Sequence, residues 1–252
     1  MTRVLVPLAV LEGESVPPGL IELLGTADVT ALGYHELPEQ TPPDQARLQY
    51  GDRATAALED VTAEFREAGG AADHRLVFTH DRDQTLRRVA AEAGVDAYAI
   101  AGATGPVERL LVSLNGEVAV EAVLDFVVEV VGGRDIDLTL LLATDDEVTG
   151  GGDGGPGEEP GRTAAGDRTT LDDAAERLRE AGLTVETELA AGTDPFDALV
   201  DAATGHDAVV MGERAPSLRS FLFGGEADRV ATETVGPVLV VRREDDGADA
   251  ES

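Results

Sequence analysis

The stretch DAVVMGERAPSLRSFLFGGEADRVATETVGPVLVVRR, Asp207 to Arg243, decides the fold of this chain. Its apolar run Val209–Met211 predicts a buried strand, which a glycine-bearing loop follows. A helix is expected over Glu226–Thr234, and a Gly-Pro pair ends it before a second apolar run at Val238–Val241. Uninterrupted apolar strands on both sides of a helix are typical of a parallel sheet that is covered on both faces.

The rest of the chain repeats this alternation of strand and helix. In the first half, the patterns predict strands at Val4–Leu8, Asp28–Gly33, Arg75–Thr79 and Ala97–Ala101, and helices at Pro17–Leu24, Asp44–Ala68 and Asp83–Ala93. In the second half they predict strands at Leu110–Leu114, Asp137–Ala143, Thr184–Ala190, Ala208–Met211 and Val238–Val241, and helices at Val118–Val131, Leu171–Ala181, Pro195–Ala203 and Glu226–Thr234. Such alternation predicts an α/β fold with parallel strands and right-handed crossovers.

The two halves resemble each other. Arg3–Ala9, RVLVPLA, matches Arg109–Asn115, RLLVSLN, and Asp83–Ala97 matches Asp194–Ala208. A repeat period above a hundred residues indicates duplicated domains rather than a solenoid. We therefore predict two doubly wound domains in tandem over residues 1–107 and 108–243, with a solvated acidic tail at 244–252.

The first half is shorter than the second. Only Gly102–Glu108 separates its fourth strand from the first strand of the second half. These residues are too few for a helix and another strand. Compared with the second half, the first half is therefore expected to lack the loop after the fourth strand, the last helix and the fifth strand, and Gly102–Gly105 is interpreted as a turn between the domains.

The charge of the chain is extreme. It has 50 acidic and 19 basic residues, a net charge of −31, and no lysine, while 42% of its residues are hydrophobic. Large net charge of one sign favours solubility, and molar salt reduces its self-repulsion by shortening the Debye length to about 3 Å. The composition indicates a protein of a salt-loving cytosol, and the charge argues against nucleic acid and anionic membranes as partners.

Several classes of site are excluded or disfavoured by the residues present. The absence of cysteine excludes disulfides, thiolate metal sites and cysteine nucleophiles. The four histidines show no metal-ligand spacing, and no metal site or catalytic residue is predicted. The Gly- and Asp-rich segment Asp145–Asp167 lacks the spacing of a calcium loop and is interpreted as a solvated linker. The first apolar run, near residue 4, is too short to span a membrane and no signal-peptide pattern follows, so we expect a cytoplasmic location.

The segment that follows Val209–Met211 resembles the C-terminal end of a universal stress protein (UspA) domain. That family carries a nucleotide-phosphate motif, Gly-x2-Gly-x9-Gly followed by Ser or Thr, after its fourth strand. The matching positions here are Gly212, Ala215, Gly225 and Glu226. The chain is thus similar to a tandem-domain, haloarchaeal-type member of the family, and the resemblance implies the strand order 3-2-1-4-5 for the second half.

The resemblance also implies a nucleotide site, and the residues of this chain weaken it. A loop that binds phosphate presents backbone N–H groups with no side chain in the way. Ala215 adds a methyl group, and Glu226 adds a carboxylate that would repel phosphate by roughly 1 to 4 kcal/mol at about 4 Å. Arg214 could compensate in part. The first strand of the family often ends in an Asp that meets the base, and this chain has Asn115 there in the second half.

The resemblance leads to one main functional expectation and two alternatives. We expect a non-catalytic, stress-associated regulatory or binding protein whose ATP or AMP site is degenerate. The first alternative is an ATP-binding member that hydrolyses slowly, and the second is a cytoplasmic regulatory partner of a transporter. Universal stress proteins commonly dimerise through their fifth strands. We therefore expect the halves to form an internal pseudo-dimer near Val238–Val241, a strand that could also serve a homodimer.

The charge leads to a prediction about salt. The melting temperature should rise as the KCl concentration is raised from low to molar values, because the salt screens the repulsion among the carboxylates. Thermal unfolding followed by circular dichroism over a KCl series measures this. A melting temperature that stays flat or falls would contradict the interpretation of the chain as halophilic.

Overall fold

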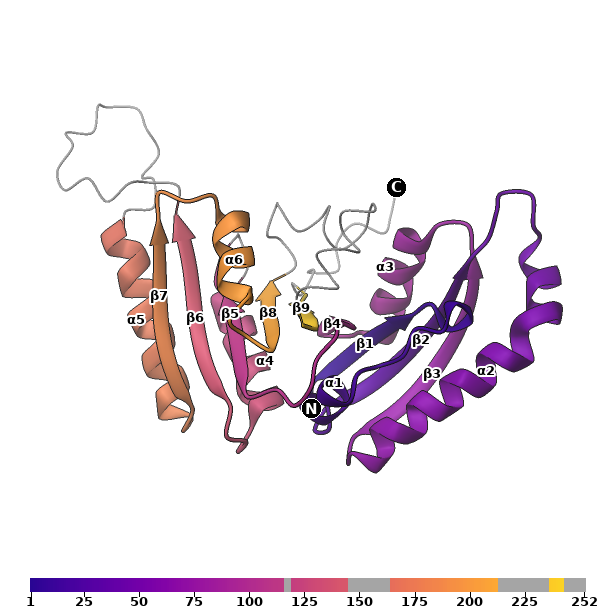
Figure 1. Cartoon of the computed structure of the whole chain (residues 1–252), viewed down its shortest axis with the longest axis horizontal. Coiled ribbons are helices and arrows are strands. Elements are labelled where there is room, and N and C mark those ends of the chain that lie inside the picture. The colour runs from indigo at the N-terminus through magenta and orange to yellow at the C-terminus, as the bar shows by residue number, and fades with distance from the viewer. Residues whose placement is uncertain (116–118, 145–163, 213–235, 243–252) are drawn as a thin grey trace.

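The apolar runs form the strands of one large sheet (Figure 1). The computed structural model describes residues 1–115, 119–144, 164–212 and 236–242. The strands are β1 (Arg3–Leu8), β2 (Asp28–Glu36), β3 (Ala71–Thr79), β4 (Ala97–Ile100), β5 (Arg109–Ser113), β6 (Asp137–Thr144), β7 (Thr184–Ala191), β8 (Ala208–Gly212) and β9 (Val238–Val241). They lie in the order β3-β2-β1-β4-β9-β8-β5-β6-β7.

The sheet is parallel except at one place. All pairs among β1 to β4 are parallel, and so are all pairs among β5 to β9. Strand β9 pairs with β4 in the antiparallel direction. The expectation of an α/β fold with mostly parallel strands is confirmed. The sheet runs without a break through both halves, and their division into two domains stays a prediction.

Strand β9 holds the two halves in this single sheet. One of its edges pairs with β8, from Val209 opposite Val238, and the other pairs with β4, from Ala97 opposite Val241. All four of its residues are buried. Because both edges are occupied, Val238–Val241 offers no free edge to a second copy. A homodimer built on this strand would have to displace β4 or β8.

The helices cover both faces of the sheet. They are η1 (Val10–Glu12), α1 (Pro18–Leu23), α2 (Pro43–Glu67), α3 (Arg82–Ala93), α4 (Val120–Val131), α5 (Ala164–Glu180) and α6 (Pro195–Ala203). The buried side chains of α1, α2, α4 and α5 share one apolar cluster that runs through both halves. Those of α3 and α6 lie in a second cluster on the opposite face. The molecule is therefore a sheet between two helical layers.

Local sequence signals explain where the helices begin. The Asp81 carboxylate accepts a hydrogen bond from the Gln84 backbone N–H at 2.9 Å and caps α3, a position that aspartate favours. Asp194 caps α6 in the same way, and a proline follows it at the first helical position.

Three predicted boundaries differ from the structure by three residues or more. Strand β2 continues past the predicted Gly33 to Glu36, and its last residues are half-buried or exposed and carry no apolar run. Strand β3 begins at Ala71, before the predicted Arg75. The early start was missed because the first residues alternate between exposed and half-buried positions and carry no apolar run. Helix α5 begins at Ala164, seven residues before the predicted Leu171, so the linker predicted over Asp145–Asp167 ends too late. Alanine is the best helix former, and an Asp in the first turn is favoured by the helix dipole. Residues 145–163 of that segment lie outside the described part.

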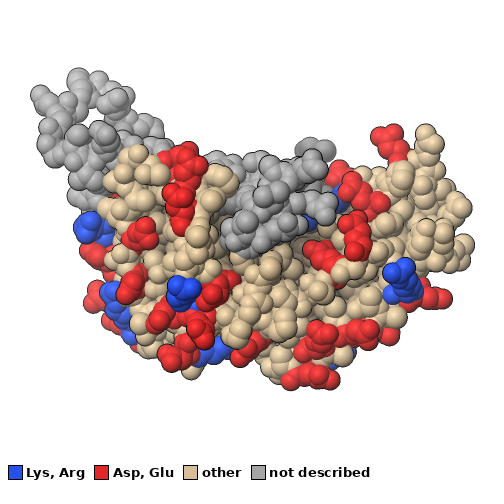
Figure 2. All heavy atoms as spheres, viewed as in Figure 1, with Lys and Arg blue, Asp and Glu red and all other residues tan. Residues whose placement is uncertain are grey.

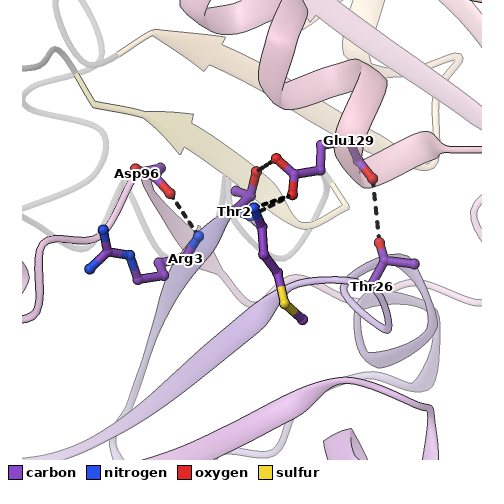
Figure 3. A network of polar contacts seen from close by, with 6 residues as sticks. Thr2, Arg3, Thr26, Asp96 and Glu129 are labelled. Carbon is purple, nitrogen blue, oxygen red and sulfur yellow. Dashed lines mark hydrogen bonds and ion pairs between the residues drawn. The ribbon is translucent and has the colours of Figure 1, made fainter.

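A polar network joins α4 to the N-terminal strand (Figure 3). The Glu129 carboxylate accepts from the Thr2 backbone N–H at 2.7 Å and from the Thr2 hydroxyl at 2.5 Å. The hydrogen bond from the Thr2 hydroxyl is the largest influence that lowers the pKa of Glu129. Arg134, just beyond α4, donates to the carbonyl oxygen of Leu23 at 2.6 Å, at the last residue of α1. These contacts fix α4 of the second half against β1 and α1 of the first.

The surface agrees with the composition. Figure 2 shows Asp and Glu side chains spread over the viewed face, with fewer Arg side chains among them. None of the helices that the structure describes combines the length and the apolar character needed to cross a membrane.

Candidate functional site

The predicted site residues fall into two groups. Asn115 follows β5 and Gly212 ends β8, while Arg214, Ala215, Gly225 and Glu226 lie outside the described residues. Strands β5 and β8 are parallel neighbours, with Ser113 opposite Met211. The structure therefore brings Asn115 and Gly212 to the same carboxyl-terminal edge of the sheet. In open α/β sheets this edge is where ligands bind.

The side chain of Asn115 is held by the backbone of the next strand. Its Oδ1 accepts from the Ala143 N–H at 3.0 Å, and its Nδ2 donates to the Ala143 carbonyl oxygen at 2.6 Å. A backbone N–H can only donate and a backbone carbonyl can only accept, so these partners determine which end of the amide is oxygen. The side chain is buried, with 9% of the residue exposed.

This contact prolongs the pairing of β5 with β6. The Leu114 N–H donates to the Leu141 carbonyl oxygen at 2.9 Å, and the Asn115 amide adds two hydrogen bonds directly beyond it. The Ser113 hydroxyl lies 3.4 Å from Asn115 Oδ1 and can donate to it. One donor and one acceptor of the amide are thus used within the protein. The interpretation of Asn115 as a group that could meet a base overlooked this structural role.

Ala9, which corresponds to Asn115 in the first half, makes a different contact. Ala9 follows β1, and its backbone N–H donates to the Glu14 carboxylate at 2.5 Å. Gly13, between them, has a φ of 82°, a left-handed conformation that favours glycine and turns the chain back. Sequence reasoning missed Glu14, although the Glu-Gly-Glu run after β1 carried a signal for such a turn.

An arginine and a tyrosine stack at the same end of the first half. The Arg82 guanidinium, in the first turn of α3, lies 5.0 Å from the centre of the Tyr34 ring. Burial raises the pKa of the Tyr34 phenol to about 12, against a smaller opposite influence of Arg82. The phenol is therefore a hydrogen-bond donor at neutral pH. Sequence reasoning missed this pair, because the two residues lie on different elements with no shared motif.

The connection between the halves presses against α1. A Cβ atom added to Gly19, in the first turn of α1, would lie 1.7 Å from the Gly105 carbonyl oxygen. Only glycine allows this approach. Gly102–Gly105, predicted as a turn between the domains, lie in the connection from β4 to β5. The N-terminal end of α1 is thus in contact with the connection itself.

The histidines can be placed as well. His206 bonds the Ala202 carbonyl oxygen through Nδ1 at 2.8 Å and the Thr139 hydroxyl through Nε2 at 2.9 Å. The first contact makes Nδ1 the protonated nitrogen, so Nε2 accepts from Thr139 in the neutral ring. Within the described ranges, no three metal-ligating side chains gather.

Comparison with known proteins identifies the family. The model of the Universal stress protein family matches residues 106–242, and the chain belongs to this family. A universal stress protein from Archaeoglobus fulgidus has a similar structure, with a TM-score of 0.60, 16% identity and 97% of each chain covered. No curated protein sequence matches the chain.

Two further solved structures are more distant. One is a universal stress protein from Archaeoglobus fulgidus in complex with dAMP, with a TM-score of 0.38 and 20% identity over 53% of this chain and 95% of that one. The other is the cytoplasmic domain of a prokaryotic cation chloride cotransporter, with a TM-score of 0.48 and 11% identity over 95% of this chain and 94% of that one. At such identities the likeness concerns the fold alone.

The contacts of Asn115 lead to a prediction. Asn115→Asp should lower the free energy of unfolding at neutral pH by about 1–3 kcal/mol, because an ionised carboxylate cannot donate to the buried Ala143 carbonyl. As the pH falls, the protonated acid can donate again, so the difference from wild type should shrink. Urea unfolding of both proteins at several pH values in molar KCl measures it.

Asn115→Ala is the matched control. It loses both hydrogen bonds, so its deficit should not shrink as the pH falls. If Asn115→Asp is as stable as wild type at neutral pH, the Ala143 contact does not have the assigned role.

Proposed function

We propose that this universal stress protein is a non-catalytic, stress-associated regulatory or binding protein with a degenerate nucleotide site. One observation carries the proposal: the amide of Asn115 is bonded to the backbone of Ala143 from both of its ends. At this position the family often has a carboxylate that meets a base. In this chain the side chain closes the ends of two strands instead.

The sequence of the phosphate loop supports the same conclusion. Ala215 places a methyl group and Glu226 a carboxylate at two of the four motif positions. Like charges in contact repel, and bulk salt does not enter such a contact to screen it. Both ends of the nucleotide site therefore differ from the family pattern.

The first half supports no nucleotide site by the same reasoning. Ala9 lacks a polar side chain, and the Glu14 carboxylate already accepts from the Ala9 N–H. The connection at Gly105 lies against Gly19, at the start of α1. An anionic ligand at this end of β1 would meet the carboxylate of Glu14.

We further propose that the halves are tandem domains that pack as an internal pseudo-dimer. Equivalent contacts recur in both. Asp96 accepts from the Arg3 N–H at 2.7 Å, and Asp207 accepts from the Arg109 N–H at 2.8 Å. In return, the N–H of each Asp donates to the carbonyl oxygen of the same Arg. The net charge of −31 supports a protein of a salt-rich cytoplasm that avoids nucleic acid.

Calorimetric titration with ATP in molar KCl tests the degenerate site. The unmodified chain should bind no tighter than about millimolar, which corresponds to about −4 kcal/mol. The double variant Ala215→Gly, Glu226→Ser should bind more tightly, because it removes one methyl group and one contact repulsion. Asn115→Asp alone should improve binding less, since it leaves the phosphate end obstructed.

Two results of the titration would contradict the degenerate site, each in a different way. Micromolar binding by the unmodified chain would overturn the degenerate site and favour the ATP-binding alternative. A double variant that binds no better than wild type would show that the obstruction lies elsewhere.

A further inference from the structure

The sheet has two outer edges, formed by β3 and β7 (Figure 1). Each of these strands pairs with one neighbour only, β2 or β6. An edge strand presents a row of unpaired N–H and carbonyl groups, which invites pairing with another chain. Among the strands that the structure describes there are no other edges, because each remaining strand lies between two neighbours.

The direction of each backbone group follows from the ladder. The Leu37 N–H donates to the Thr79 carbonyl oxygen, so the odd-numbered residues of β3 turn their polar groups toward β2. In a parallel pair these groups alternate in direction along the strand. The backbone N–H and carbonyl groups of the even-numbered residues, Ala72 among them, therefore point away from β2, toward the free edge. Likewise the Gly192 N–H donates to the Thr144 carbonyl oxygen, so the even-numbered residues of β7 turn their backbone groups toward β6. The backbone groups of Val185 and the other odd-numbered residues therefore point toward the free edge.

Arginines bind these outward carbonyl groups at both edges. Arg66 donates through Nη2 to the Ala72 carbonyl oxygen at 2.5 Å, and Arg179 donates through Nη2 to the Val185 carbonyl oxygen at 2.7 Å. At the β3 edge, Nη2 of Arg47 also lies 3.5 Å from the outward carbonyl oxygen of Leu76.

The two arginines occupy equivalent places. Arg66 is the penultimate residue of α2, and Ala72 is the second residue of β3. Arg179 is the penultimate residue of α5, and Val185 is the second residue of β7. The charge of an arginine in the last helical turn also suits the helix dipole. That effect explains the residue type but not the bond to the outward carbonyl of the next strand.

We propose that Arg66 and Arg179 close the two edges of the sheet and prevent a second copy of the chain from adding a strand. The guanidinium occupies an acceptor that an incoming strand needs, and its bulk and charge cover the edge. Both arginines are exposed. Exposed polar contacts contribute little to stability, so removal should affect association more than folding.

The protection that these arginines give against association matters most at high salt. At low salt, repulsion between chains of net charge −31 opposes association. In molar salt the Debye length falls to about 3 Å, and this repulsion no longer keeps the edges apart. Closure of the edges by side chains then becomes the main protection.

Sedimentation equilibrium of single variants in molar KCl tests the proposal. Methionine keeps the apolar stem of the arginine and removes the donor. Arg179→Met should raise the average mass about twofold, because two freed β7 edges can pair around a twofold axis and then leave no edge free. The triple variant Arg47→Met, Arg66→Met, Arg179→Met should form larger, open-ended assemblies, because both edges are then freed.

Two controls separate edge pairing from other effects. Arg168→Met removes the same charge from an exposed position of α5 and should keep the wild-type mass. Adding Thr187→Pro to Arg179→Met should restore the wild-type mass. The backbone N–H of Thr187 points toward the free edge, and a proline there removes this N–H, which only an added strand would use. Circular dichroism of each variant verifies that it is folded.

Three results would overturn the proposal. The mass of Arg179→Met could equal that of wild type at every salt concentration. Arg168→Met could associate to the same extent, which would assign the effect to charge. Association could also persist when Thr187→Pro is added, which would place it on another surface.

Discussion

The antiparallel pairing of β4 with β9 joins the two halves and determines how they lie against each other. The first half contributes four parallel strands, and β4 would be an edge without a partner from the second half. Strand β9 fills this position and still pairs with β8. The pairing makes one sheet from two parallel blocks and brings α4 against α1 and β1. The contacts of Glu129 with Thr2 and of Arg134 with Leu23 follow from this arrangement.

Several arginines in this chain form hydrogen bonds to backbone carbonyl groups rather than ion pairs. With 50 acidic residues present, ion pairs would be the expected use of its 19 basic ones. Several of the described arginines instead donate to backbone carbonyl groups at the ends of helices or at the edges of the sheet, as do Arg134, Arg66 and Arg179. Five donors in a planar fork suit this use better than the point charge of lysine. A bond to a neutral carbonyl also depends less on salt than a surface ion pair does.

Much of the fold could be predicted from the sequence, because its signals are local. Apolar runs gave the strands, and helical periodicity gave the helix Asp83–Ala93 to within one residue of α3. The start of β3 was missed because an edge strand carries no continuous apolar run. In the site, the motif gave the position of Asn115 but not its bonds, which depend on how β6 lies beside β5. The contacts of Glu14 with Ala9 and of Arg82 with Tyr34 likewise arise only once the chain has folded.

Through β9 the two halves form one cooperative unit. Differential scanning calorimetry of the intact chain in molar KCl tests it most directly. One transition is expected, with a calorimetric enthalpy equal to its van 't Hoff enthalpy, because the shared strand makes the two halves unfold together. Two separate transitions, with one half still folded after the other has melted, would contradict it.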